Sequence, residues 1–108
     1  MKRGELYRVR RPPGEPKPAR VFVVVSRQSV IDSNFSTVVC APVFSIRHGL
    51  PTEVPAGETE GLKHQSAILC DGLASIDKSR LTDFIGELSP AKLHDLDRAL
   101  AAALSLRR

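Results

Sequence analysis

Residues 17–26 read KPARVFVVVS, and this stretch decides the fold. Residues 21–25 form an unbroken apolar run in which every side chain is β-branched or aromatic. Such residues favour strands, and a strand without polar alternation is typical of burial on both faces. Arg20 stands directly before this run. A guanidinium in that position either caps the strand in solvent or serves as a ligand for phosphate.

The chain before this strand predicts a second strand and a stiff loop. ELYRVR, residues 5–10, alternates apolar and polar side chains, although imperfectly, and this indicates a half-buried strand. RPPGEPKPAR, residues 11–20, contains four prolines and one glycine. Proline fixes φ and lacks an N–H, so neither a helix nor a strand ladder is expected in this basic loop.

More strands are expected after it. Apolar runs predict buried strands over residues 36–44 and 66–72, and shorter strands are expected over 52–55, 73–76 and near 83–86. Pro42 lies inside the first of these runs. A proline within a strand implies an edge position or a bulge.

The C-terminal part predicts one helix. Ser89 is a good N-cap, and Pro90 is the residue best tolerated at the first helical position. Over residues 91–106 the apolar side chains recur at intervals of three and four, which is typical of a helix that packs one stripe on a sheet. The order of elements predicts one mainly β domain over residues 1–108 with a C-terminal helix, an α+β fold. We expect a small barrel or a strongly bent antiparallel sheet.

The overall composition limits the function classes. The chain has 108 residues, 42% of them hydrophobic, and no apolar run approaches the ~20 residues of a membrane span. No apolar stretch follows the opening MKRGEL, so we expect no secretory signal, no membrane association and a cytoplasmic protein. Cys40 and Cys70 each lie in an apolar run, which favours buried free thiols over a disulfide.

Positive charge is concentrated at one end of the chain. The net charge is +4, and residues 1–20 contain seven Lys or Arg against two acidic residues, so the whole excess resides there. A local basic field suits a polyanionic partner. A solvated basic terminus that only aids solubility explains the same pattern, and composition does not separate the two.

Candidate functional residues stand at the ends of the predicted strands. The spacing of the histidines and cysteines matches no metal site, so we expect no metal and no cofactor. The polar residues that begin or follow buried strands are Arg20, Ser45, Arg47, His48 and Asp71. In a curved sheet these strand ends can converge, and such a set would suit binding and cleavage of a phosphodiester. Each residue also has an ordinary interpretation as a strand cap, turn former or loop residue.

Five blocks of sequence form a recurring set: KRGELYRV (2–9), ARVFVVVS (19–26), VCAPVFS (39–45), LPTEV (50–54) and SAILCDGLASIDKSRL (66–81). Together they resemble the MazF/PemK family of toxins from toxin–antitoxin systems. Each block is weak alone, but they occur in the family order and cover nearly the whole chain. The resemblance implies an SH3-like barrel, a homodimer and a cognate antitoxin as partner.

The resemblance also implies a chemistry. Toxins of this family cut single-stranded RNA without a metal, with the substrate's 2′-hydroxyl as nucleophile, and leave a 2′,3′-cyclic phosphate and a 5′-hydroxyl. Arg20 stands where the family has the arginine beside the scissile phosphate. The implied catalytic residues are Arg20, Ser45 and Asp71. Contacts with RNA are expected from Arg11, Lys17, Ser26, Phe44, Arg47 and His48.

The sequence departs from the family pattern at three places. Val21 replaces a proline, Phe44 replaces the threonine commonly assigned to catalysis, and Gly72 begins a segment that lacks a family Gln and Arg. If a bulge at Pro42 shifts the strand, Ser45 turns toward the site as a phosphate donor. If the strand is regular, Phe44 faces the site and offers a ring for base stacking. The expected function is therefore an endoribonuclease, fully active or attenuated. The alternative is a binding module on the same fold that contacts RNA or a protein, as a topoisomerase poison does.

Overall fold

The computed structural model describes residues 1–10, 14 and 19–106. Its strands are β1 (Glu5–Val9), β2 (Arg20–Val24), β3 (Thr37–Phe44), β4 (Glu53–Ala56), β5 (Ser66–Leu69), β6 (Ala74–Asp77) and β7 (Asp83–Glu87). The helices are α1 (Gln28–Ile31) and α2 (Pro90–Ala103), and the 3₁₀ turns are η1 (Glu58–Glu60), η2 (Cys70–Gly72) and η3 (Lys78–Arg80). The predicted mainly β fold with a C-terminal helix is confirmed.

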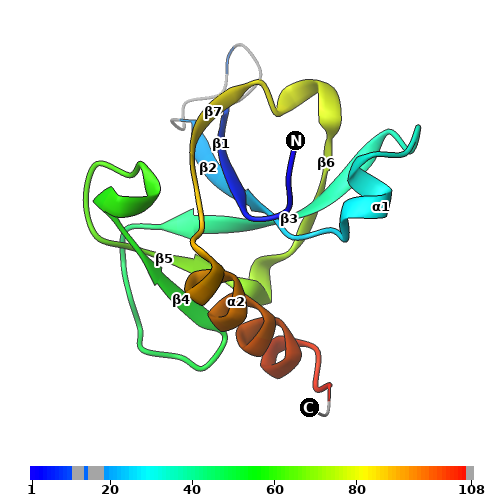
Figure 1. The fold of residues 1–108 in the computed structure, drawn as a ribbon. Coiled ribbons are helices and arrows are strands. Elements are labelled where there is room, and N and C mark those ends of the chain that lie inside the picture. Colours follow the sequence, from blue (N-terminus) through cyan, green and yellow to red (C-terminus); the bar gives the residue numbers. More distant parts are fainter. Residues whose placement is uncertain (11–13, 15–18, 107–108) are drawn as a thin grey trace.

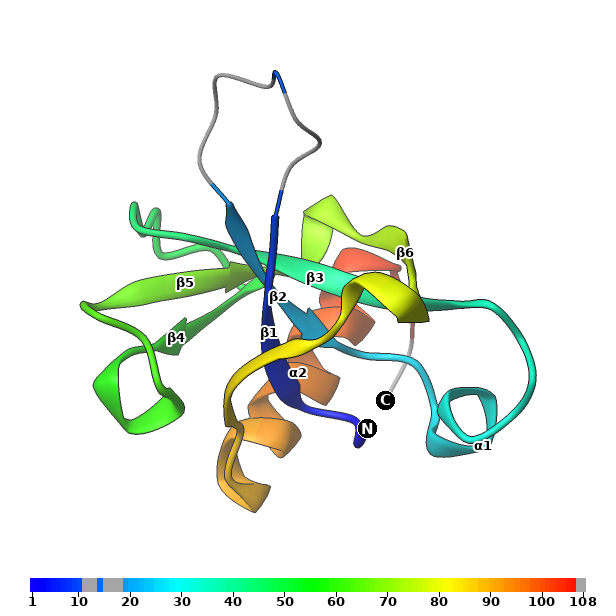
Figure 2. The same cartoon turned by 90° about the horizontal axis from the view of Figure 1, so that it is seen from above.

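All the strands join one curled antiparallel sheet in the order β4-β5-β3-β2-β1-β7, and β6 pairs with β3 outside this path. The long strand β3 organises the sheet. One of its edges pairs with β2, and the other pairs first with β6 and then with β5. Figures 1 and 2 show β3 crossing the middle of the molecule, with the sheet curled around it and α2 packed on one side.

Strands β2 and β3 lie between two hydrophobic cores. Val23 and Ala41, paired across the strands, face a core that includes Leu96 of α2. Val24 and Cys40, the next pair, face a second core on the other side of the sheet. This arrangement confirms buried strands within both predicted runs, although Val21 and Phe44 are half-buried and Ser36 is exposed. It also holds the ends of both strands firmly in place.

Pro42 is accommodated without a bulge, so that alternative of the sequence analysis is wrong. Pairing with β2 runs in unbroken register through Pro42, which lies opposite Phe22. The Val25 N–H donates to the Val39 carbonyl at 2.9 Å, so in the alternating antiparallel pattern the Pro42 nitrogen faces the other edge of β3. There β6 pairs only as far as Cys40 and β5 begins at Val43. The missing N–H falls in the gap between two partner strands.

Several boundaries differ from the sequence-based expectation. The run over 66–72 is a strand only to Leu69, because residues 70–72 turn into η2. A short helix, α1, follows β2 in a segment for which no helix was predicted. Helix α2 begins at Pro90 as predicted, with the Ser89 hydroxyl accepting from the Lys92 N–H at 3.2 Å, but ends at Ala103.

The two cysteines are buried free thiols, as expected. Burial raises the pKa of Cys40 to about 12, which keeps this thiol protonated. The pKa of Cys70 is raised to about 11, chiefly by burial and further by the charge of Asp71. Within the described residues, no helix is long and apolar enough to cross a bilayer.

Candidate functional site

Arg20, the first residue of β2, is held by two contacts. One guanidinium nitrogen donates to the Val43 carbonyl at 3.2 Å, and the guanidinium carbon lies over the Phe44 ring, 4.1 Å from its centroid. The sheet register explains both contacts, because extending the Phe22–Pro42 pairing by two residues brings Arg20 opposite Phe44. A cation over an aromatic face contributes about 0.5–1 kcal/mol of interaction free energy when the pair is exposed, and more when it is shielded from water. Arg20 is therefore oriented before any ligand arrives.

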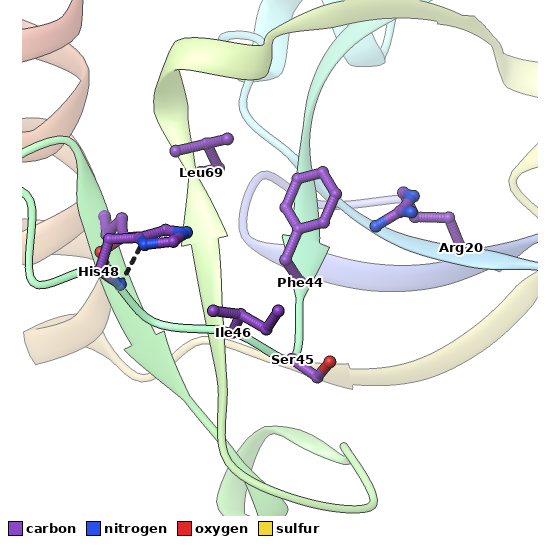
Figure 3. Close-up of a pocket in the computed structure, with 7 residues that line it drawn as sticks. Arg20, Phe44, Ser45, Ile46, His48 and Leu69 are labelled. Atoms are coloured by element: carbon purple, nitrogen blue, oxygen red, sulfur yellow. Dashed lines mark hydrogen bonds between the residues drawn. The ribbon is translucent and has the colours of Figure 1, made fainter.

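The same sheet face continues away from Arg20. Phe44 pairs with Ala67, and Leu69, two residues further along β5, pairs with Glu53 of β4. Because side chains alternate along strands, Arg20, Phe44, Leu69 and Glu53 all project from one face. Figure 3 shows the Phe44 ring standing between Leu69 and Arg20.

A cavity of about 330 Å³ lies over this face, and we call it the Phe44 cavity. The loop after β3 forms its other wall (Figure 3). Among the described residues its lining consists of Arg20, Phe44, Ser45, Ile46, His48, Glu53 and Leu69. The walls are mainly apolar. Arg20 and Glu53 are the charged residues of the lining, and His48 adds an imidazole ring.

A second cavity of about 460 Å³ shares Arg20, Phe44 and Ser45 with the first, and we call it the basic groove. Arg8, Lys63 and His64 also line it, and its described lining includes no carboxylate. Arg8 pairs opposite Val21, and both line this groove together with Arg20, although an ion pair of 3.5 Å to Asp83 offsets part of the charge of Arg8. The groove thus gathers positive charge on one side of Arg20.

Four of the residues expected at the site come together there. Arg20, Ser45 and His48 all line the Phe44 cavity, and Phe44 forms its central wall. Ser45 follows the end of β3 and is exposed, and its side chain lies below the Phe44 ring in the view of Figure 3. Phe44 thus takes the position facing Arg20, as expected for a regular strand.

Other expected residues lie elsewhere. Asp71 lines neither cavity, because η2 turns it toward β4, where its carboxylate accepts from the Thr52 hydroxyl at 2.7 Å. Ser26 lies beyond the opposite end of β2 from Arg20, and its hydroxyl accepts from the Val39 N–H at 2.7 Å. Arg47 is exposed in the loop after β3. Arg11 and Lys17 lie outside the described residues.

Sequence reasoning missed several groups that the fold brings to the site. Arg8, Lys63 and His64 join the basic groove, and Glu53 joins the Phe44 cavity. The signal for Arg8 was its outward position on an alternating strand. Lys63 and His64 lie in a polar loop, and no local pattern ties that loop to Arg20. Among residues 1–10, 14 and 19–106, no three His, Cys, Asp or Glu side chains form a group able to hold a metal ion.

Comparison with known proteins identifies the family. The sequence model of the PemK-like, MazF-like toxins of type II toxin–antitoxin systems matches residues 2–104. The chain belongs to this toxin family. It is 31% identical to endoribonuclease MazF3 of Mycobacterium tuberculosis over 88 residues, covering 82% of this chain and 84% of the relative. It is 29% identical to endoribonuclease MazF1 of Mycobacterium bovis over 104 residues, covering 96% and 92%.

The fold of this MazF-like toxin agrees with solved relatives. A mycobacterial endoribonuclease solved in complex with its cognate antitoxin superposes with a TM-score of 0.84 at 28% identity, covering all of this chain and 98% of the other. The resemblance deduced from the five sequence blocks is therefore confirmed across the chain.

Glu53 organises the loop that closes the Phe44 cavity of this toxin. Its Oε1 accepts from the Leu50 N–H at 3.0 Å and from the His48 N–H at 3.1 Å. Hydrogen bonds from main-chain N–H groups, with Leu50 the largest contributor, hold the pKa of the Glu53 carboxyl below its usual value of 4.5 against the opposing effect of burial. The carboxylate is therefore ionised at neutral pH.

We predict that the loop loosens only in acid. Because the folded-state pKa of Glu53 is depressed, its stabilising contribution is complete above pH 4.5 and is lost as pH falls through the lower folded value. An NMR titration that follows the amide signal of Leu50 should show a midpoint below 4.5. A midpoint at or above 4.5 would contradict the hydrogen-bonded arrangement.

Proposed function

We propose that this protein is an endoribonuclease toxin that cuts single-stranded RNA in the cytoplasm without a metal. The substrate's 2′-hydroxyl is the nucleophile, and the products carry a 2′,3′-cyclic phosphate and a 5′-hydroxyl. The observation that carries the proposal is Arg20, fixed by Val43 and Phe44 between the Phe44 cavity and the basic groove. The names of the endoribonuclease relatives support the same reaction class.

Arg20 suits the transition state of this reaction. The 2′-oxygen attacks phosphorus, the bond from phosphorus to the 5′-oxygen breaks, one proton leaves the 2′-oxygen and another reaches the departing 5′-oxygen. Negative charge grows on the non-bridging oxygens as the 2′-oxygen adds. A guanidinium is planar and always charged, and it can donate to two of these oxygens at once. Because Phe44 already orients the guanidinium, little reorganisation accompanies the reaction.

The two cavities supply a path for the RNA on either side of Arg20. The basic groove, with Arg8, Lys63 and His64, suits the phosphodiester backbone, since it holds cations and no carboxylate among its described lining residues. Ser45 borders both cavities and is the hydroxyl nearest in sequence to the family's threonine. Because β3 is regular, the Ser45 side chain does not share the face of Arg20 and Phe44. Its place at the border of both cavities is the basis on which we propose it as a hydrogen-bond donor to the phosphate.

The partners that we propose are a second copy of the chain and an acidic antitoxin segment. A relative has been solved with its cognate antitoxin, and all of this chain superposes on it. The positive charge of residues 1–20 suits an acidic peptide as well as RNA. Antitoxin bound over this face would therefore compete with substrate.

A second candidate function rests on Phe44. A phenyl ring cannot donate a hydrogen bond, so the position facing Arg20 contributes packing and stacking where the family has a hydroxyl. With this loss the barrel could bind RNA or a protein and cut slowly or not at all. A cleavage assay with purified protein in EDTA separates the two functions.

Arg20→Ala should lower the rate of RNA cleavage by about 10²-fold or more, as loss of one transition-state donor typically does. The measurement is single-turnover cleavage of a short RNA in EDTA, with circular dichroism to verify folding. Arg27→Ala is the matched control, because Arg27 is an exposed arginine near the far end of β2. Equal rates for wild type and Arg20→Ala would overturn the proposed role.

Ser45→Ala should lower the cleavage rate about tenfold, since it removes one neutral donor to the phosphate. Ser79→Ala, at an exposed serine in η3, serves as the control and should cut at the wild-type rate. If Ser45→Ala also cuts at the wild-type rate, the serine makes no contact with the phosphate.

Light scattering at micromolar concentration should report a homodimer. The free toxin is the appropriate sample, because bound antitoxin would add mass. A monomeric mass under these conditions would contradict the proposed assembly.

A further inference from the structure

The Phe44 cavity has the walls of a site for one flat ring. Phe44, Ile46 and Leu69 supply apolar surface, and Ile46 is 67% exposed on the loop that closes the cavity. One face of the Phe44 ring is occupied by Arg20, and Leu69 stands on the other side of the ring (Figure 3). The volume of about 330 Å³ is near the lower end of the ~300–1,000 Å³ typical of small-molecule sites. A nucleobase stacked on aromatic and aliphatic side chains fits this description.

The polar edge of the cavity comes from Glu53. Its Oε1 accepts hydrogen bonds from the N–H groups of Leu50 and His48, whereas Oε2 accepts a longer one of 3.3 Å from the same His48 N–H. A carboxylate oxygen has two lone pairs, so Oε2 retains capacity for another donor. The loop contacts also fix the carboxylate in position, which gives this acceptor a defined direction.

An ionised carboxylate can only accept hydrogen bonds, and this property discriminates between bases. Cytosine, adenine and guanine each carry an exocyclic amino group, whereas uracil presents a carbonyl oxygen at the position of the cytosine amino group. Cytosine can therefore donate to Glu53. Uracil presents its O4 acceptor at that place and can meet the carboxylate only through N3–H, which lies between two carbonyl oxygens that repel the anion.

We propose that the Phe44 cavity binds the nucleobase adjacent to the phosphate held by Arg20, and that Glu53 selects a base with an exocyclic amino group over uracil. The inference rests on the proposed ribonuclease function for the identity of the ligand as RNA. Phe44 supplies affinity that tolerates any base, since every base has a stacking face, and Glu53 supplies the selectivity. Phe44, which stands where the family has a threonine, thereby has a role in substrate binding.

The test compares two RNA probes whose bases differ at C4, which carries an amino group or an oxygen, and in the proton on N3. The probes are 2′-O-methyl octamers of cytidine and of uridine, which lack the free 2′-hydroxyl and so cannot be cut by the proposed reaction. Their dissociation constants are measured by fluorescence anisotropy at fixed salt, because backbone contacts depend on salt. Wild type should bind oligo(C) about tenfold more tightly than oligo(U), in the range of one base-specific hydrogen-bonded contact.

Glu53→Gln should abolish or reverse this preference. The glutamine oxygen can still accept from the Leu50 and His48 N–H groups, while its amide nitrogen replaces Oε2 with a donor that suits the uracil oxygen. Glu58→Gln is the matched control, because it removes one negative charge at an exposed glutamate of η1 outside both cavities. This control should keep the full preference for oligo(C).

Equal affinity of wild type for the two octamers overturns the proposal, and this result stands even if Glu53→Gln does not fold. A preference that survives in folded Glu53→Gln overturns the role of Glu53. Cleavage of the corresponding unmodified RNAs is assayed in parallel. Cleavage without a binding preference would refute only the base site, whereas a preference without cleavage would refute only the ribonuclease.

Discussion

The contact between the Arg20 guanidinium and the Phe44 ring depends on the register of β2 against β3. Arg20 opens one strand and Phe44 ends the other, and only the pairing of Phe22 with Pro42 brings them opposite each other. A slip of one residue would turn every side chain of the strand to the other face. The register is secured because both strands are buried on two sides, between the cores that contain Val23 and Val24. The position of Arg20 opposite Phe44 is therefore fixed by the packing of β2 and β3 between the two cores.

The positions of the strand ends separate the two charged side chains of the site, Arg20 and Glu53. Beyond the cores, the shared face of β2, β3, β5 and β4 carries side chains that no longer need to be apolar. Arg20 and Glu53 occupy the two ends of this face, with Phe44 and Leu69 between them. The cation that we propose for phosphate and the anion that we propose for a base edge are thus kept apart by apolar surface. An ion pair between them would neutralise both.

The parts of the fold that follow from local physical chemistry could be predicted from the sequence. The unbroken β-branched run before Ser26 predicted a strand buried on both faces, and the Ser89–Pro90 pair predicted the start of α2. Asp71 was predicted at a strand end because residues 66–72 form one apolar run, but the chain turns at Cys70 and carries Asp71 away. Nothing in the sequence around Pro42 indicates that its nitrogen faces the gap between β6 and β5.

The candidate site was only partly predictable, because some of its residues are brought there by pairing between strands that are distant in the sequence. Arg20, Ser45 and His48 flank strand ends, and the curled sheet brings them together as expected. Lys63 and Glu53 reach the two cavities through the placement of β5 and β4, which depends on long-range pairing. Sequence spacing contains no information on such contacts.

We propose that Arg20 promotes attack by the RNA's own 2′-hydroxyl, without a metal. The decisive measurement is mass spectrometry of the fragments from a short RNA cut by the purified toxin in EDTA. We expect fragments that end in a 2′,3′-cyclic phosphate and fragments that begin with a 5′-hydroxyl. Fragments with a 5′-phosphate and a 3′-hydroxyl, or cleavage that EDTA abolishes, would contradict it.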